Sequence, residues 1–341
     1  MKATQLATFL ASAIAKRLPV LLVGPPGVGK TDISNQAAAQ AGAKLLVSHP
    51  VVSDPTDAKG LPWVGKDGKS ATFLPFGEMK QAIDATELTV WLLDDLGQAQ
   101  PAVQASYMQL LLSRRINGHV LPDCVTFIAA SNRRTDRAGV SGILEPVKSR
   151  FVSIITLEPS LDDWCQWAFT NADIPPELIA FLRFRPELLC KFTPSADLSN
   201  CPLPRTWHNA GKILGLQLPA AIEGEALGGA VGEGAAVELA AFLRMYRELP
   251  NIDAILLDPD VQPIPSDPAV LYAVVTGLAI KANDQNFGRI ARYTERLASG
   301  GHGEFATLLI RDVMRKTPDL ANTPEFARLA SGETGKLFTG M

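Results

Sequence analysis

The chain has 341 residues, of which 47% are hydrophobic and 20% are charged, and its formal net charge at pH 7 is −3. This length exceeds what one compact core usually holds, and the composition is that of a folded rather than a disordered protein. The acidic balance argues against nucleic acid as the main partner, and four cysteines without a C-x-x-C pair argue against a zinc site or a disulfide framework.

The first predicted element is an N-terminal helix. Leu6, Phe9, Leu10, Ala13 and Ile14 recur at steps of three and four residues, which indicates an amphipathic helix rather than a cleaved signal. No run of 18 apolar residues occurs in the sequence, so no membrane-spanning segment is expected. We therefore expect a soluble protein of the reducing cytoplasm.

The first half of the chain alternates short apolar runs with helical stretches. Continuous apolar runs are typical of strands buried on both faces of a parallel sheet. The five runs are 19–24, 43–48, 88–95, 124–131 and 151–158, and the clearest helices between them are 30–42 and 101–115. The pattern predicts an α/β domain over residues 1–158, with a parallel five-stranded sheet and right-handed crossovers.

The second half of the chain reads as helical. Apolar residues follow helical spacing over 161–172, 175–184 and 205–217, and again after the Gly/Ala-rich stretch 223–236. A Pro/Asp-rich segment at 258–268 predicts a loop or a sub-domain boundary. We expect an all-helical lid over residues 159–250 and a helical C-terminal region over residues 251–341.

A glycine-rich motif lies between the first predicted strand and the next helix. Residues 24–31, "GPPGVGKT", fit the pattern G-x-x-x-x-G-K-[ST]. In this context backbone N–H groups wrap phosphates at a helix N-terminus, Lys30 reaches the β- and γ-phosphates, and the Thr31 hydroxyl ligates Mg²⁺. The alternative is a turn that merely starts a helix. The predicted nucleotide-binding residues are Gly24, Pro25, Pro26, Gly27, Val28, Gly29, Lys30, Thr31 and Asp32.

Two adjacent carboxylates end the third apolar run, "VWLLDD". Ligands of open α/β sheets bind at the carboxyl ends of the strands, so Asp94 is predicted to hold Mg²⁺ directly or through a water. Asp95 is then the candidate that orients and activates the attacking water. A solvated strand end without a function is the alternative for both residues.

Four motifs together resemble the AAA+ ATPases. "GPPGVGKT", "VWLLDDLGQA", "IAASNRR" and "VKSRF" stand in the order seen in that superfamily, and the chain looks like its MoxR-like, dynein-related branch. Residues 54–79 resemble the β-hairpin insertion in helix 2 (about 53–76), and residues 111–123 resemble the hairpin before sensor 1 (about 113–124). The resemblance implies a three-layer αβα P-loop NTPase core with ATP and Mg²⁺ as cofactors.

The resemblance also implies roles for polar residues outside the P-loop. Asn132 matches sensor 1, Arg150 matches the arginine finger, and Arg205 matches sensor 2. Lys148 competes with Arg150 for the role of the finger. The plain alternatives are a turn asparagine after a strand and solvated or salt-bridged surface arginines.

Similar proteins form rings, so the resemblance implies a homo-oligomer, expected to be a hexamer, that hydrolyses ATP to remodel a partner protein. It suggests a partner that contains a von Willebrand factor A domain. A nucleic-acid motor or loader is one alternative, and a nucleotide-gated scaffold with negligible hydrolysis is another. The scaffold stays open because Asp95 stands where most members of the family have glutamate, and its carboxylate reaches about 1.5 Å less far.

Overall fold

The computed structural model describes residues 1–65, 67–136, 142–194, 197–247 and 252–338. The chain divides into two compact units, one of Met1–Ser160 with the short segment Phe192–Ala196, the other of Leu161–Lys191 with Asp197–Met341. The first is called the α/β unit below, and the second the helical unit. The predicted C-terminal region falls in the helical unit, and so does the predicted lid except for residues 159–160 and 192–196, which belong to the α/β unit.

A five-stranded parallel sheet forms the centre of the α/β unit, in the spatial order β2-β5-β8-β1-β9. Each strand falls inside one of the predicted apolar runs: β1 Val20–Val23, β2 Lys44–Ser48, β5 Thr89–Leu93, β8 Val125–Ser131 and β9 Ser153–Thr156. The predicted parallel five-stranded sheet is therefore confirmed.

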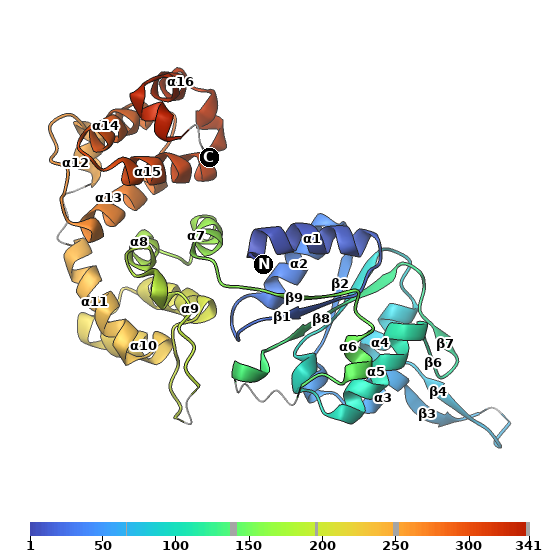
Figure 1. Ribbon diagram of the computed structural model, residues 1–341. Helices are drawn as coiled ribbons and strands as arrows, with labels where there is room; N and C mark the ends of the chain where they lie inside the picture. The colour runs from blue at the N-terminus through green and yellow to red at the C-terminus, as the bar shows by residue number, and fades with distance from the viewer. Residues whose placement is uncertain (66, 137–141, 195–196, 248–251, 339–341) are drawn as a thin grey trace. The chain divides into compact units, whose positions relative to one another are not determined.

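Helices cover both faces of this sheet, which makes three layers (Figure 1). Alternate residues of one strand pack on opposite faces, so Val90 and Leu92 join one core cluster while Trp91 and Leu93 join the other. The first cluster contains the buried faces of α1 (Ala3–Ala15) and α2 (Lys30–Gln40), and the second those of α4 (Gly77–Ile83) and α5 (Pro101–Ser113). The unit also has α3 Pro55–Lys59, α6 Glu145–Lys148, and the 3₁₀ turns η1 Pro50–Val52, η2 Leu96–Gln98 and η3 Arg134–Asp136.

Two antiparallel hairpins extend this unit beyond the sheet, in the regions where hairpins are expected. The first is β3 (Leu61–Val64) with β4 (Ala71–Leu74), and the second is β6 (Arg115–Ile116) with β7 (His119–Val120). The second turns at Asn117 and Gly118, which both have positive φ, as a type I′ hairpin turn requires. The hairpins are joined because His119 Nε2 lies 2.7 Å from the carbonyl oxygen of Phe73.

The helical unit contains no strand among its described residues. Its helices are α7 Leu161–Phe169, α8 Pro176–Phe184, α9 Pro204–Leu214, α10 Ala220–Val231, α11 Glu233–Arg247, α12 Ile252–Leu257, α13 Pro268–Lys281, α14 Phe287–Ser299, α15 Gly303–Lys316 and α16 Pro324–Ser331. Short 3₁₀ turns lie at η4 Pro186–Leu188, η5 Pro318–Asn322 and η6 Glu333–Leu337. Within the described ranges, no helix has the length and apolar character that crossing a membrane demands.

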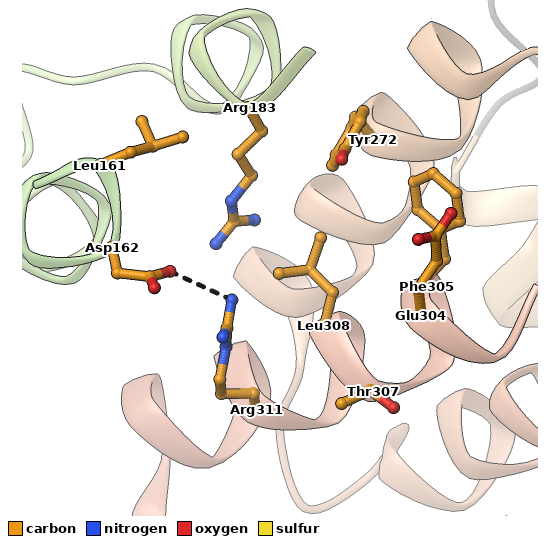
Figure 2. A pocket seen from close by; sticks show the side chains of 9 residues that line it. All are labelled: Leu161, Asp162, Arg183, Tyr272, Glu304, Phe305, Thr307, Leu308 and Arg311. Carbon is orange, nitrogen blue, oxygen red and sulfur yellow. Dashed lines mark hydrogen bonds and ion pairs between the residues drawn. The ribbon is translucent and has the colours of Figure 1, made fainter. Parts of the chain in front are cut away.

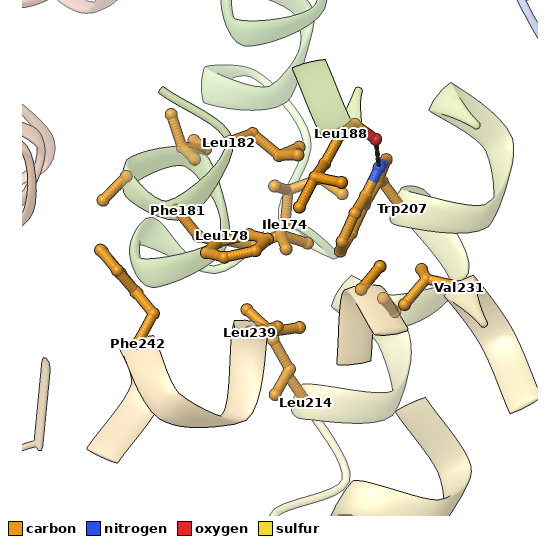
Figure 3. Close-up of a cluster of buried hydrophobic side chains, with 14 of the residues drawn as sticks. Ile174, Leu178, Phe181, Leu182, Leu188, Trp207, Leu214, Val231, Leu239 and Phe242 are labelled. Carbon is orange, nitrogen blue, oxygen red and sulfur yellow. Dashed lines mark hydrogen bonds between the residues drawn. The ribbon is translucent and has the colours of Figure 1, made fainter. Parts of the chain in front are cut away.

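One core of the helical unit is built around Trp207 (Figure 3). The Trp207 indole is buried, and its Nε1 donates a hydrogen bond to the carbonyl oxygen of Leu188 at 2.7 Å. Phe181 packs against this ring with a centroid distance of 5.6 Å. Most of the Gly/Ala-rich stretch lies in helix α10, whose Leu227 and Val231 are buried in the same core, and its last residues begin α11. Tertiary packing there offsets the low helix propensity of glycine.

A buried ion pair joins α8 to α15. Arg183 Nη1 and Asp312 Oδ2 are 2.5 Å apart, and the two side chains are only 5% and 0% exposed. Removal of one partner leaves a buried charge without compensation, and this costs much more than the net worth of the pair.

We expect Asp312→Ala to lower the free energy of unfolding by about 3–5 kcal/mol, whereas the double change Arg183→Met with Asp312→Leu costs less than the single change. Urea unfolding followed by circular dichroism measures both. The matched control is Arg292→Ala, which breaks the half-exposed Arg292–Asp260 pair and should cost under about 1 kcal/mol. Equal losses for the buried and the exposed pair would contradict this prediction.

Candidate functional site

The loop between β1 and α2 has the backbone that a phosphate cradle needs. Gly27 and Gly29 have φ values of 66° and 99°, which are left-handed conformations that favour glycine. Gly24 lies so close to the neighbouring backbone that a Cβ there would be 3.0 Å from the carbonyl oxygen of Leu157. The loop ends where α2 begins at Lys30, and the N–H groups of a first helical turn have no partners within their own helix.

Lys30 lies against this loop and reaches another strand. Its buried ammonium donates to the carbonyl oxygens of Gly24 at 3.1 Å and Pro25 at 3.0 Å, and to Oδ1 of Asn132 at 2.6 Å. Asn132 directly follows β8, which pairs with β1 in parallel so that Val23 aligns with Ser131. The carboxyl ends of neighbouring parallel strands thus bring the P-loop lysine and the predicted sensor 1 residue together.

Thr31 and Asp94 form the second contact of the site. The Thr31 hydroxyl donates to Oδ2 of Asp94 at 2.7 Å. Asp94 is 8% exposed and follows β5, whose last residue Leu93 is paired with β8 at Ala129. The backbone N–H of Asp94 donates to the carbonyl oxygen of Ser48 at the end of β2. Two oxygen-bearing side chains therefore stand side by side at the carboxyl edge of the sheet.

These oxygen atoms fit a Mg²⁺ ion. Mg²⁺ prefers hard oxygen ligands, and it is usually held by one or two carboxylates together with substrate phosphates and waters rather than by an all-protein cage. The Thr31 hydroxyl and the Asp94 carboxylate match that donor set. No group of three or more His, Cys, Asp or Glu side chains within the described residues is arranged to hold a metal ion.

Asp95 lies next to these groups in an unusual backbone conformation. Its φ of 56° and ψ of 33° are left-handed, a region that Asp and Asn enter more readily than other residues with a Cβ. Its Oδ1 accepts a hydrogen bond from Nδ2 of Asn132 at 3.3 Å. Asn132 therefore stands between Lys30 and Asp95, and it contacts the first through its oxygen and the second through its nitrogen.

The remaining P-loop residues line the same turn. Gly24, Pro25 and Gly27 are buried, whereas Pro26, Val28 and Gly29 are partly exposed. Asp32 is an exposed acidic residue in the first turn of α2, and the structure assigns it no contact with Lys30 or Asp94.

The two predicted finger residues lie around the C-terminus of α6. Arg150 Nη1 donates to the Ser149 hydroxyl at 2.8 Å, while the buried Arg150 Nε has no hydrogen-bond partner in the described part of the chain. Lys148 Nζ is paired with Glu145 at 2.5 Å. Within the described residues, no hydrogen bond or ion pair joins either side chain to the P-loop. The third cation, Arg205, is exposed on α9 of the helical unit.

Two features of the site were not predicted from the sequence. One is the Lys30–Asn132–Asp95 chain of hydrogen bonds, and the other is the left-handed backbone of Asp95. The second has a signal in the sequence, since Asp95 is followed by Leu96 and Gly97 in a turn, and Asp is favoured in such turns.

Comparison with known proteins gives a family for the α/β unit. The family model "AAA domain (dynein-related subfamily)" matches residues 19–151. No curated protein matches the chain in sequence.

Among solved structures, NtrX from Brucella abortus in complex with ATP is 13% identical with a TM-score of 0.43, and the match covers 99% of this chain and 67% of that chain. RuvB from Thermotoga maritima, a Holliday junction branch migration motor, is 14% identical with a TM-score of 0.36, and the match covers 95% of this chain and 89% of that chain. Likenesses this remote do not bear on function.

Proposed function

We propose that this chain, whose residues 19–151 form an AAA domain of the dynein-related subfamily, is a MoxR-like ring ATPase that remodels or activates a partner protein. The observation that carries the proposal is the convergence of three motifs at one edge of the sheet. Lys30 contacts Asn132, Asn132 contacts Asp95, and Thr31 contacts Asp94. A cation, an amide, a hydroxyl and two carboxylates are the set of groups that binds a nucleoside triphosphate and acts on its γ-phosphate.

Each residue has a separate task in the proposed mechanism. Lys30 balances charge on the β- and γ-phosphates, and the amides of the glycine loop donate hydrogen bonds to them. Thr31 and Asp94 would hold Mg²⁺, which supplies neutralisation of the charge on the phosphate oxygens. Asp95 accepts a proton from the attacking water, and Asn132 keeps that water and the Asp95 carboxylate in place.

In a ring, one subunit can supply a guanidinium to the nucleotide of its neighbour. Phosphoryl transfer spreads negative charge over the γ-oxygens, and a guanidinium supplied in trans stabilises it. Arg150 suits this role because its Nε has no partner within the described part of its own chain, whereas Lys148 is already paired with Glu145. We propose that Arg150 reaches the nucleotide of the neighbouring subunit, that Arg205 acts as sensor 2, and that the ring is a hexamer.

The β3–β4 hairpin supports a protein as the partner. Trp63 and Val64 are 65% and 68% exposed, and Leu61 and Leu74 are about half exposed. Exposed apolar side chains gathered on one hairpin are typical of a surface that binds another protein. A client with a von Willebrand factor A domain is our specific proposal, and a pull-down with a hydrolysis-deficient, ATP-bound variant such as Asp95→Asn tests it.

Asp95 decides between a motor and a scaffold that binds ATP without turning it over. We expect Asp95→Asn to lower steady-state ATP turnover about 10²–10⁴-fold while ATP affinity stays unchanged, because the amide cannot accept the proton. A phosphate-release assay and a titration with a fluorescent ATP analogue measure the two quantities. Wild-type turnover no higher than that of Asp95→Asn would establish the scaffold instead.

Asp95→Glu measures the reach of the carboxylate separately. Glutamate enters the left-handed region less readily than aspartate, so the unfolding midpoint of this variant is measured beside its turnover. A faster enzyme would show that the short side chain limits the wild-type rate. Unchanged turnover would show that the backbone of Asp95 already brings its carboxylate to the water.

A further inference from the structure

Buried polar side chains join distant segments in both units of the chain, and those of the helical unit compensate one another. A cavity of about 250 Å³ lies beside the buried Arg183–Asp312 pair, and Figure 2 shows Arg311 at its edge, paired with Asp162. Three guanidinium groups stand there against three carboxylates, those of Arg183, Arg311 and Arg315 against Asp162, Asp312 and Glu304. The charges around this cavity therefore balance within the unit.

The α/β unit contains a buried amide, Gln104 on α5, which joins two loops. Gln104 is only 1% exposed. Its Nε2 donates to the carbonyl oxygens of Ala99 at 3.0 Å and Gly142 at 2.9 Å, and its Oε1 accepts from the backbone N–H of Leu144 at 3.0 Å. The reverse orientation of the amide would place its oxygen against two carbonyl oxygens, so the three partners define how it lies.

The first of these loops follows Asp95. Turn η2 begins directly after Asp95, and the buried Ala99 follows the end of that turn. The carbonyl oxygen of Gly97, inside the turn, accepts from the backbone N–H of Gly142 at 3.3 Å. The two loops are therefore joined directly at Gly97 and through the side chain of Gln104 at Ala99.

The second loop leads into α6 and on to Arg150. The carbonyl oxygen of Leu144 accepts from the N–H of Lys148 at 3.0 Å, and the carbonyl oxygen of Val147 accepts from the N–H of Arg150 at 3.1 Å. A continuous set of hydrogen bonds thus runs from the Gln104 amide through Leu144 and α6 to the backbone of Arg150.

Helix α6 depends on its anchors because it has only four residues. A helix this short is not stable by itself. Its anchors are the Gln104 amide at its start, the fully buried Val147 within it, and Val152 beyond its end, whose N–H donates to the carbonyl oxygen of Pro19 at 2.9 Å. Loss of the anchor at its start would leave the helix free to tilt about the other two.

We propose that Gln104 is a positioning residue for the arginine that acts in trans. It holds the loop before α6 against the loop after Asp95, and thereby sets where Arg150 stands toward the neighbouring subunit. The inference rests on the proposed function, because it takes Arg150 as the finger. Misplacement of a group by about 1 Å can cost about 10²-fold in rate, so an anchor of this kind affects turnover without touching the nucleotide.

Gln104→Met tests the proposal, because methionine keeps the length of the side chain and removes its strong hydrogen bonds. We expect steady-state ATP turnover to fall about 10–10²-fold while ATP affinity equals that of the wild type, since the P-loop of the same subunit is intact. The matched control is Gln109→Met, which changes an exposed glutamine of the same helix and should leave both quantities unchanged.

Gln104→Glu is a second variant, in case Gln104→Met does not fold. It keeps an acceptor for the N–H of Leu144 but turns its other oxygen toward the carbonyl oxygens of Ala99 and Gly142, so it should show the same pattern. The thermal unfolding midpoint tells whether each variant is folded at the assay temperature.

Mixed rings separate a misplaced finger from a damaged nucleotide site. A Gln104→Met subunit should behave like an Arg150→Ala subunit. Its mixture with Lys30→Ala, which keeps a well-placed finger, should regain part of the wild-type activity, whereas its mixture with Arg150→Ala should not. Recovery with Arg150→Ala, or with neither partner, would overturn the proposal, because the defect would then lie in the subunit's own site.

The reference mixture joins Arg150→Ala with Lys30→Ala subunits. If this mixture does not recover, the proposed finger fails, and the role of Gln104 fails with it. If it recovers while the mixture of Gln104→Met with Lys30→Ala does not, the role of Gln104 alone is wrong.

Hydrogen exchange followed by mass spectrometry gives a measurement that does not need ATP turnover. Backbone amides of residues 142–150 should exchange about tenfold faster in Gln104→Met than in the wild type, because their loop has lost its bonds to α5. Gln109→Met should leave this exchange unchanged. Equal exchange in wild type and Gln104→Met would show that Gln104 does not hold the loop, and this too would overturn the proposal.

Discussion

Lys30→Ala should reduce steady-state ATP turnover to about 1% of the wild-type value or less and weaken ATP binding at least tenfold. Lys30 is the ammonium that the P-loop holds against Gly24, Pro25 and Asn132, at the place where the β- and γ-phosphates would lie. Loss of one preorganised donor to a developing negative charge typically costs about 10²–10³ in rate. A coupled phosphate-release assay measures turnover, and titration with a fluorescent ATP analogue measures affinity.

The matched control is Lys80→Ala, which removes an exposed lysine of the same unit that pairs with Asp84. Its turnover and affinity should equal those of the wild type, because exposed ion pairs contribute little. The circular dichroism spectrum and the thermal unfolding midpoint of each variant should equal those of the wild type. Full activity of a folded Lys30→Ala protein would show that the P-loop is not the nucleotide site.

Arg150→Ala should lower turnover about 10³-fold or more while each subunit still binds ATP with wild-type affinity. A guanidinium supplied in trans is worth about 10³–10⁵ in the rate of phosphoryl transfer, and it acts on the transition state rather than on bound ATP. At matched protein concentration, steady-state ATP turnover should fall while ATP affinity equals that of the wild type.

Mixing separates an arginine that acts in trans from one that acts within its own chain. In a ring that mixes Arg150→Ala with Lys30→Ala subunits, some interfaces join an intact P-loop to an intact Arg150, so the mixture should regain part of the wild-type activity. Lys148→Ala is the comparison, and it should keep activity because Lys148 is paired with Glu145. No recovery on mixing, or a loss confined to Lys148→Ala, would contradict the assignment.

The layered half of the fold could be predicted because local and global signals agree there. A strand buried on both faces must be continuously apolar, and β5 and β8 are buried along their whole length. Asp94 and Asn132 directly follow β5 and β8, so both lie at one edge of the sheet once the strands are parallel, and there they meet the P-loop residues Thr31 and Lys30. The order of the strands in the sheet did not follow from the chain alone.

Other features depend on contacts between segments that are distant in the sequence. Helix α10 contains Gly224, Gly228 and Gly229, which individually disfavour a helix, and its packing against the core around Trp207 offsets this. The Arg183–Asp312 pair joins residues 129 positions apart, and no pattern in the sequence predicts that either side chain is buried. The cavity beside Arg183 could not be predicted for the same reason.

The double role of Asn132 limits how this sequence can change. The side chain faces an ammonium on one side and a carboxylate on the other, and it accepts from Lys30 while it donates to Asp95. An aspartate there would repel Asp95, and a lysine would repel Lys30, whereas a primary amide suits both neighbours. Positions 30, 95 and 132 are therefore expected to vary together, and an engineered change of charge at one of them calls for a compensating change at another.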